Sequence, residues 1–180
     1  MRPLATALGI CVVSVALFGQ SAQSLQKQLE SEAAKLRTWG SDAELVAAVK
    51  AQNAKRVPLK IIQTLDADWI AGKAEALVKQ TTGATCSAHL RQLAGANATY
   101  GEVFVMDDQG ALVCANAKTS DYWQGDEAKW QRAFNSGKGD VFIDRPRYDE
   151  SASRNLAQIS VPVLDGGKAI GVITVGLSLR

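Results

Sequence analysis

The sequence is poor in the residues from which proteins build metal centres and catalytic triads. Its 180 residues include one histidine and three cysteines, so a two-histidine zinc site is excluded by count. It also lacks a surplus of charge, because 20 basic residues stand against 18 acidic ones, whereas nucleic-acid-binding domains carry a clear basic excess. With 47% hydrophobic residues, the composition is typical of a globular domain. We therefore expect one domain with no metal, no cofactor and no nucleic-acid partner.

Common catalytic signatures are missing as well. The chain has no Gly-x-Ser-x-Gly elbow, no His-Glu-x-x-His helix and no phosphate-binding Gly-Lys-Ser/Thr loop. Its acidic pairs at residues 107–108 and 149–150 fall in expected turns or loops, where carboxylates are ordinarily solvated. We therefore expect a binding protein rather than an enzyme.

Residues 1–24 have the layout of a secretory signal peptide. Arg2 is their only charge, an apolar run of about 15 residues follows, and small residues including Ala22 and Ser24 close the segment. The apolar run is shorter than the ~20 residues of a membrane-spanning helix. We expect cleavage after Ser24, with cleavage after Ser21 as an alternative, and a soluble periplasmic or secreted protein. The other interpretation is an uncleaved N-terminal membrane anchor.

Export would leave Cys86 and Cys114 as the two cysteines of the mature chain. In an oxidising compartment such a pair most often forms a disulfide. The alternative is two buried free thiols. His89 lies three residues after Cys86 on an expected helix, where a surface or capping histidine and a Cys–His dyad are both compatible with the spacing.

The first half of the chain has helical periodicity. Residues 25–39 repeat apolar side chains at helical spacing, and Gly40 ends the run. Ser41 and Glu44 have the spacing of a capping box that opens a second helix. Helical patterns continue over residues 59–79, where Gly72 is a candidate break, and near residues 87–93.

The second half has the pattern of strands. Residues 102–106 and 111–115 form an expected hairpin around an Asp-Gly turn, and residues 156–163 and 169–179 form another. Between them we expect a helix over 126–134, a strand over 140–144 and a polar loop over 145–154. The last strand is apolar on both faces, which is typical of a central strand. The fold class is therefore α+β, with about five antiparallel strands.

Four segments in order resemble the extracytoplasmic Cache sensor domain, which has a PAS-like fold. They are residues 103–113, residues 124–126 leading to Trp130, residues 137–142, and residues 159–173. The resemblance covers residues 100–179. It implies a PAS-like antiparallel sheet over 100–180, with a long N-terminal helix and further helices of segment 25–99 packed on it as one domain.

The resemblance also implies a function. Such a domain binds a small organic molecule between its sheet and the loop and helix that cover it, and relays occupancy to a partner. Since the last expected strand ends one residue before Arg180, we expect a free-standing module that acts on a membrane receptor or signalling partner. The alternative is a protein–protein accessory subunit without a ligand, or a homodimer formed through the N-terminal helix.

The segment between the hairpins supplies the candidate ligand-binding residues. Aromatic rings, an arginine for a carboxylate and an aspartate for an ammonium suit a small-molecule pocket. The candidates are Tyr122, Trp123, Asp126, Trp130, Asp144, Arg145, Arg147 and Tyr148. Each has a purely structural alternative: core packing for the aromatic residues, helix capping for Asp126, and a solvated loop for the charged run.

Three positions depart from the amino-acid-binding members of the family. Ala128 replaces the arginine that precedes the helix tryptophan by two residues, Gln131 replaces the following tyrosine, and Gly176 replaces an aspartate on the closing strand. Amino-acid recognition is therefore not transferred to this chain. A small organic acid bound by Arg145, Arg147 or Lys129 and a neutral or aromatic ligand both stay open.

Overall fold

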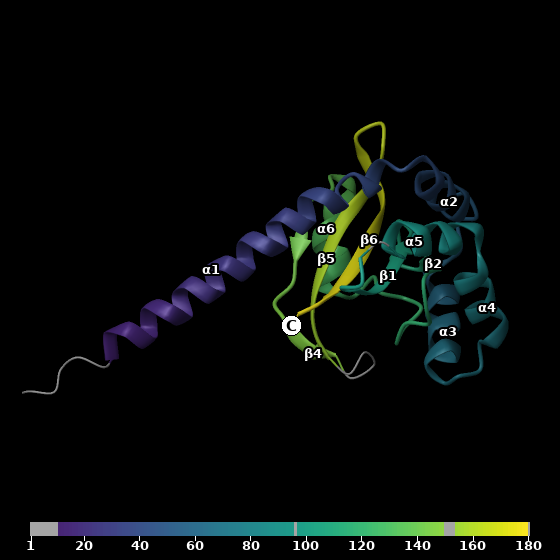
Figure 1. Ribbon diagram of the computed structural model, residues 1–180. Coiled ribbons are helices and arrows are strands. Elements are labelled where there is room, and N and C mark those ends of the chain that lie inside the picture. The colour runs from purple at the N-terminus through teal and green to yellow at the C-terminus, as the bar shows by residue number, and fades with distance from the viewer. Residues whose placement is uncertain (1–10, 96, 150–153, 180) are drawn as a thin grey trace, which may run out of the picture.

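Helices from the first part of the chain cover an antiparallel sheet built from the second part (Figure 1). The computed structural model describes residues 11–95, 97–149 and 154–179, without the side chains of residues 11–22, 148–149 and 154–155. The helices are α1 (Cys11–Leu36), η1 (Trp39–Ser41), α2 (Ala43–Asn53), α3 (Leu59–Ile70), α4 (Glu75–Gly83), α5 (Thr85–Gly95), α6 (Ala128–Phe134) and η2 (Asn135–Gly137). The strands are β1 (Tyr100–Met106), β2 (Leu112–Ala115), β3 (Phe142–Ile143), β4 (Arg147–Asp149), β5 (Arg154–Asp165) and β6 (Lys168–Ser178).

The strand order confirms the expected α+β class and the two hairpins. Within the described ranges the sheet runs β2-β1-β6-β5-β3, and β4 adds to β5 beside β3. Strand β6 lies between β1 and β5 and is buried along most of its length, which confirms the predicted central strand.

The predicted polar loop over residues 145–154 is wrong at its centre. Arg147 pairs with Leu156 and Asp149 with Arg154, so residues 147–149 form strand β4. The strand forms because an extended partner, β5, lies alongside. Its polar sequence carries no apolar alternation of its own that would have indicated a strand.

The two faces of the sheet have different cores, because alternate residues of each strand point to opposite sides. The sealed face is the side on which Val103, Val105 and Ile173 pack against α1, α2 and α5. The open face is the side that carries Phe104 and Thr174, beneath α6 and the segment before it. Helix α3 adds Ile62 and Trp69 to the apolar cluster at the β2 end of the open face.

The predicted capping box at Ser41 is wrong by one residue. Asp42 is the N-cap of α2, and its Oδ1 accepts hydrogen bonds from the Glu44 amide at 3.0 Å and the Leu45 amide at 3.1 Å. Ser41 lies in the 3₁₀ turn η1, so the first extended residue before the helix is Asp42. A carboxylate there also interacts favourably with the helix dipole.

Gly72 breaks the helical stretch as anticipated. Helix α3 ends at Ile70, and Gly72 takes a φ of +72°, a left-handed conformation that glycine adopts without strain. The predicted helix over residues 59–79 is therefore two helices, α3 and α4.

A disulfide joins Cys86 on α5 to Cys114 on β2, with the two Cα atoms 6.1 Å apart. The predicted pairing is confirmed. It fastens a helix of the sealed face to an outer strand of the sheet.

Helix α1 runs without interruption past the expected cleavage site at Ser24. Its last turns bury Leu29, Ala33 and Leu36 on the sealed face, while its first part extends away from the sheet (Figure 1). None of the helices in the described part of the chain is both long enough and apolar enough to span a membrane. Residues 1–10 lie outside the described residues, and the signal peptide stays a prediction.

Candidate ligand-binding site

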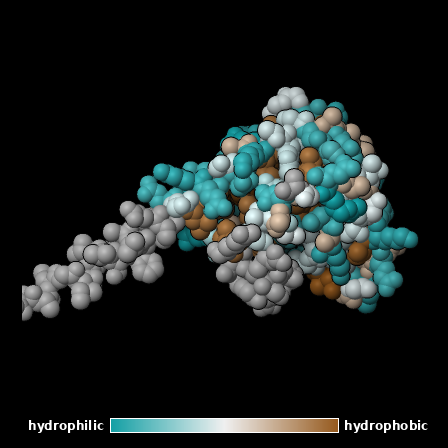
Figure 2. All heavy atoms as spheres, viewed as in Figure 1, coloured by the Kyte–Doolittle hydropathy of each residue, from teal (hydrophilic) through white to brown (hydrophobic). Residues whose placement is uncertain are grey.

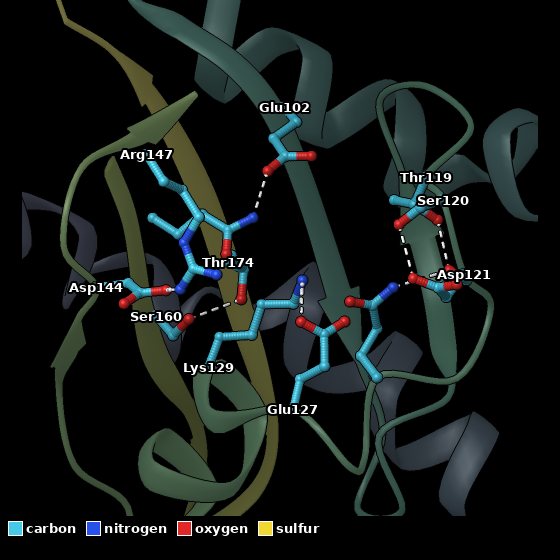
Figure 3. Close-up of polar contacts among 12 residues, drawn as sticks. Glu102, Thr119, Ser120, Asp121, Glu127, Lys129, Asp144, Arg147, Ser160 and Thr174 are labelled. Carbon is cyan, nitrogen blue, oxygen red and sulfur yellow. Dashed lines mark hydrogen bonds and ion pairs between the residues drawn. The ribbon is translucent and has the colours of Figure 1, made fainter. Parts of the chain in front are cut away.

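A cavity of about 300 Å³ lies on the open face, between the sheet and the segment that covers it. Its volume is at the lower end of the range for small-molecule sites, roughly 300–1,000 Å³. The sheet contributes Glu102, Phe104, Leu156 and Gln158; the cover contributes Thr119, Ser120, Asp121, Gln124, Glu127 and Lys129; and the segment before β5 contributes Asp144, Arg145 and Arg147. Figure 3 shows most of these side chains converging from the two sides.

The floor of the cavity depends on Gly176. In the register, Glu102 of β1 and Gln158 of β5 both lie opposite this glycine of β6. Gln158 Nε2 donates to Glu102 Oε1 at 2.7 Å, across the space that a side chain would fill. A Cβ atom at Gly176 would lie 2.6 Å from Glu102 Cγ. The glycine therefore allows a carboxylate from the neighbouring strand to lie over the centre of the sheet.

Lys129 brings a buried ammonium to the cavity. It lies in the first turn of α6, and its side chain is only 9% exposed. Its Nζ is 3.0 Å from Glu127 Oε2 (Figure 3). The same atom lies 5.4 Å from the centroid of the Phe104 ring. The lysine therefore has one charged partner and one aromatic face, which together offset the cost of burying its charge.

Gln124 places an unsatisfied acceptor in the cavity wall. Its side chain is fully buried, and its Nε2 donates to the Asp121 carbonyl oxygen at 2.8 Å. That bond fixes which end of the amide is the donor. The other end, Oε1, has no hydrogen-bond partner among the described residues. Buried polar atoms are ordinarily satisfied, so this oxygen calls for a donor from a ligand or from water.

The mouth of the cavity is charged and more exposed. Arg147 forms an ion pair with Asp144, whose Oδ1 also accepts from the Arg145 amide at 2.8 Å. Arg145 and Arg147 are both exposed, whereas Asp144 is half-buried. The cavity wall therefore carries both positive and negative side chains. Its cations are the two arginines at the entrance and Lys129 inside.

The structure brings three of the eight predicted residues to this cavity, namely Asp144, Arg145 and Arg147. Tyr148 lies on β4, but its side chain is outside the described residues. Asp126 is exposed and does not line the cavity.

Three of the four predicted aromatic residues, Tyr122, Trp123 and Trp130, lie outside the cavity wall and brace the segment that covers it. Trp123 Nε1 donates to the Gln109 carbonyl at 2.8 Å, and Trp130 Nε1 donates to the Asp107 carbonyl at 3.0 Å. Trp130 also stacks on Phe134, as its structural alternative anticipated. Tyr122 is buried against Trp69, and this burial raises the pKa of its hydroxyl to about 12.

Sequence reasoning missed Glu102, Gln124 and Gln158 as lining residues. Glu102 directly precedes the apolar residues 103–106 of β1, and Gln158 lies between Ala157 and Ile159 of β5. A polar residue on a strand that pairs with the central strand was a visible signal. Gln124 carried no such signal, because its burial depends on how the covering segment folds back.

Comparison with protein-family models finds no match, and no curated protein matches. Solved structures do match. They include the sensory domain of the Campylobacter jejuni chemoreceptor Tlp3 with isoleucine bound, at 15% identity over 94% of this chain and 64% of that domain, with a TM-score of 0.36. They also include the ligand-binding domain of the Pseudomonas aeruginosa amino acid chemoreceptor PctC with GABA, at 14% identity over 72% of this chain and 61% of that domain, with a TM-score of 0.43.

A third match is the sensor domain of the Vibrio cholerae histidine kinase DctB, at 10% identity over 87% of this chain and 58% of that domain, with a TM-score of 0.38. The chain thus spans about three-fifths of the length of the solved domains it matches. All three are sensory or ligand-binding domains.

Proposed function

We propose that this protein is an exported sensor-type domain that binds a small polar molecule in the open-face cavity and relays its occupancy to a partner protein. The observation that carries the proposal is the unsatisfied Oε1 of Gln124, fully buried in the wall of a cavity of ligand size. A bound molecule with a hydrogen-bond donor would satisfy this oxygen.

The wall also suggests what the ligand carries. Next to Gln124, the Asp121 carboxylate accepts from Ser120 Oγ at 2.7 Å and adds a negative charge to the same end (Figure 3). Lys129 and Arg147 already pair with Glu127 and Asp144, whereas Arg145 adds a further cation at the mouth. We therefore infer a ligand with an amine, amide or hydroxyl donor at one end and an acceptor or carboxylate at the other.

A physical route supports the relay. Glu102, on the cavity floor, lies on β1 two residues after Tyr100, with a shift of register between them. The Tyr100 hydroxyl donates to Glu32 Oε2 of α1 at 2.9 Å. Burial and the bond to Glu32 raise the pKa of Tyr100 to about 12, so the hydroxyl stays a donor at physiological pH. A ligand that moves Glu102 would therefore act on a strand whose Tyr100 hydroxyl is hydrogen-bonded to α1.

The test is thermal unfolding of the protein against a panel of small amines, organic acids, amino acids and polyols. A ligand at 100 times its Kd should add about 2.7 kcal/mol to the free energy of unfolding. Gln124→Met should weaken that ligand roughly tenfold or more, because its donor loses its buried partner. A panel without any stabilising compound would overturn the proposal.

Gln131→Met is the matched control for that variant. Gln131 also donates from Nε2 to a backbone carbonyl of the covering segment, that of Gly125 at 3.2 Å, but it is exposed and does not line the cavity. It should leave ligand affinity unchanged. Equal losses in the two variants would mean that the covering segment, rather than the Gln124 oxygen, determines binding.

The alternative function is a dimerisation module, which the first part of α1 would favour in an uncleaved chain, because that part extends away from the sheet (Figure 1). Deleting the helix would not test this, because Leu29 and Leu36 belong to the core. Light scattering across a range of protein concentrations tests it directly. A dimer at every concentration, together with no response to the panel, would support this alternative over ligand sensing.

A further inference from the structure

The chain's single histidine bridges two helices of the sealed face, away from the cavity. His89, on α5, has Nε2 at 2.9 Å from Oδ2 of Asp42, the N-cap of α2. Its other ring nitrogen, Nδ1, lies 3.5 Å from Oε2 of Glu44 in the first turn of α2. Both nitrogens of one imidazole therefore face carboxylates of the same helix terminus.

This arrangement fits only one protonation state well. A neutral imidazole has one N–H donor and one lone pair, so one of its nitrogens would face a carboxylate as an acceptor. The doubly protonated ring can donate to both sides and also offsets two negative charges. The buried Oε1 of Glu44 has no hydrogen-bond partner among the described residues, so a cation beside this carboxylate offsets part of the cost of burying that oxygen.

No competing charge comes from the other elements that pack on α5, within the described residues. The β1 and β2 surfaces beneath the helix carry Val103, Val105 and Cys114. On the α4 side, Arg91 is held by the Thr82 carbonyl oxygen at 3.0 Å. Within α5 itself, the side chain of Gln92 is a neutral hydrogen-bond partner of the ring.

We propose that His89 is a proton-operated latch, which holds the N-terminus of α2 against α5 while the ring is protonated and loosens as the pH rises. This goes beyond ligand binding, because it makes the fold itself sensitive to the pH of its surroundings. Histidine suits such a role, since its charge changes near neutral pH.

The direction of both pKa shifts agrees with the latch. The hydrogen bond to Asp42 raises the pKa of His89 above its ordinary 6.5, against the opposing effect of burial. Burial alone would raise the pKa of Asp42, but the bonds from His89 and from the amides of Leu45 and Glu44 lower it below its ordinary 3.8. The stabilisation from His89 is complete below pH 6.5 and is lost as the pH rises through its raised pKa, whereas that from Asp42 is lost only in acid.

Loosening the N-terminus of α2 also affects both hairpins, because the other end of this helix contacts them. Asn53, its last residue, accepts from the Asp108 amide at 3.1 Å and donates to the Ile170 carbonyl at 2.7 Å. These contacts hold the β1–β2 turn and the beginning of β6. A weaker hold on the first turn of α2 therefore lowers the local stability of the helix that positions them.

Because the chain has one histidine, NMR titration of the imidazole reports His89 without assignment. We expect a pKa above 6.5 in the wild type, and a fall toward 6.5 in Asp42→Ser, which keeps an N-cap oxygen but removes the charge. A wild-type pKa at or below 6.5, or one that Asp42→Ser leaves unchanged, would overturn the latch.

Thermal unfolding between pH 6 and 9 supplies the second measurement. From pH 6 to 9 the wild-type Tm should fall by about 2–4 °C more than that of His89→Gln, whose amide donates at every pH. Parallel profiles for the two proteins would show that the histidine does not confer the pH dependence. If His89→Gln does not fold, the Asp42→Ser titration still decides.

Discussion

The two faces of the sheet differ in what their residues do, although the same strands build both. On the sealed face, Val103, Ile173 and Val175 pack beneath three helices, and the disulfide fastens one of those helices to β2. On the open face, the residues next to them along the strands include Glu102 and Thr174. The space-filling view shows how the polar surface is interrupted by apolar patches (Figure 2).

This difference shows how a small domain can contain a polar cavity and remain stable. The larger of the two apolar clusters lies on one side of β6, and a smaller one, which includes Trp69 and Phe104, lies on the other. The other side can then carry a buried lysine, an unsatisfied amide oxygen and a carboxylate over the sheet. Each of those groups costs free energy, which the sealed face offsets. Changes on the sealed face should therefore affect stability most, and changes on the open face should affect binding most.

The largest expected effect comes from removing the disulfide. Cys86→Ser with Cys114→Ser opens a loop with a sequence separation of 28 residues, and should lower the free energy of unfolding by about 3–4 kcal/mol in the chain-entropy model. Urea denaturation of the variant, and of the wild type with and without reductant, measures it.

Binding at the cavity should survive this change, because the disulfide lies on the sealed side. The control is the thermal response of the double variant to whichever compound stabilises the wild type. A folded variant that no longer responds would contradict the separation of the two faces.

Two glycines of β6 offer a matched pair of smaller changes, one on each face. A Cβ at Gly171 would collide with the Met106 carbonyl oxygen and lie 2.8 Å from Val49 Cγ1. Backbone cannot move aside cheaply, so Gly171→Ala should cost about 2–3 kcal/mol. The atoms nearest to a Cβ at Gly176 all belong to the flexible Glu102 side chain, so Gly176→Ala should cost about 1 kcal/mol, the typical value of a hydrogen bond such as that between Glu102 and Gln158.

Chemical denaturation ranks the two alanine variants, and ligand titration separates them further. Gly176→Ala should change affinity at the cavity, because it displaces the Glu102 carboxylate from the floor. Gly171→Ala should leave the affinity of the folded protein unchanged. The reverse ranking, either in stability or in affinity, would contradict the assignment of stability to the sealed face and of binding to the open face.

Much of the fold could be predicted because its signals are local. Helical periodicity, the Asp-Gly and Gly-Gly turns and the apolar pattern of β6 each lie within one short segment. The N-cap of α2 was misplaced because Ser41 and Asp42 are both good caps, and the 3₁₀ turn η1 decides between them. Strand β4 was missed because only its partner β5 makes it a strand.

The site was harder to predict because it depends on side-chain direction. Trp123 and Trp130 are residues of the type that lines pockets. Each indole N–H, however, donates to a backbone carbonyl oxygen within the protein. Such bonds join segments that the sequence does not show to be neighbours. Glu102, by contrast, precedes a run of buried apolar residues. A charge in that position indicates a polar site on the sheet and could have been recognised from the sequence.

A last pair of variants tests whether polarity on the open face is required for folding or only tolerated. Ser160 and Thr174 are fully buried on neighbouring strands beneath α6, and their hydroxyls are hydrogen-bonded to each other at 2.8 Å (Figure 3). Thr174→Val should cost about 1–2 kcal/mol, because it leaves the Ser160 hydroxyl without its partner. Adding Ser160→Ala removes that orphan, so the double variant should recover most of the loss, and urea denaturation of the full cycle gives the coupling free energy. Recovery would mean that an apolar pair serves the fold equally well at this position, and that the open face is polar for binding rather than for folding. A double variant as unstable as the single one would instead mean that the fold requires the hydroxyl pair.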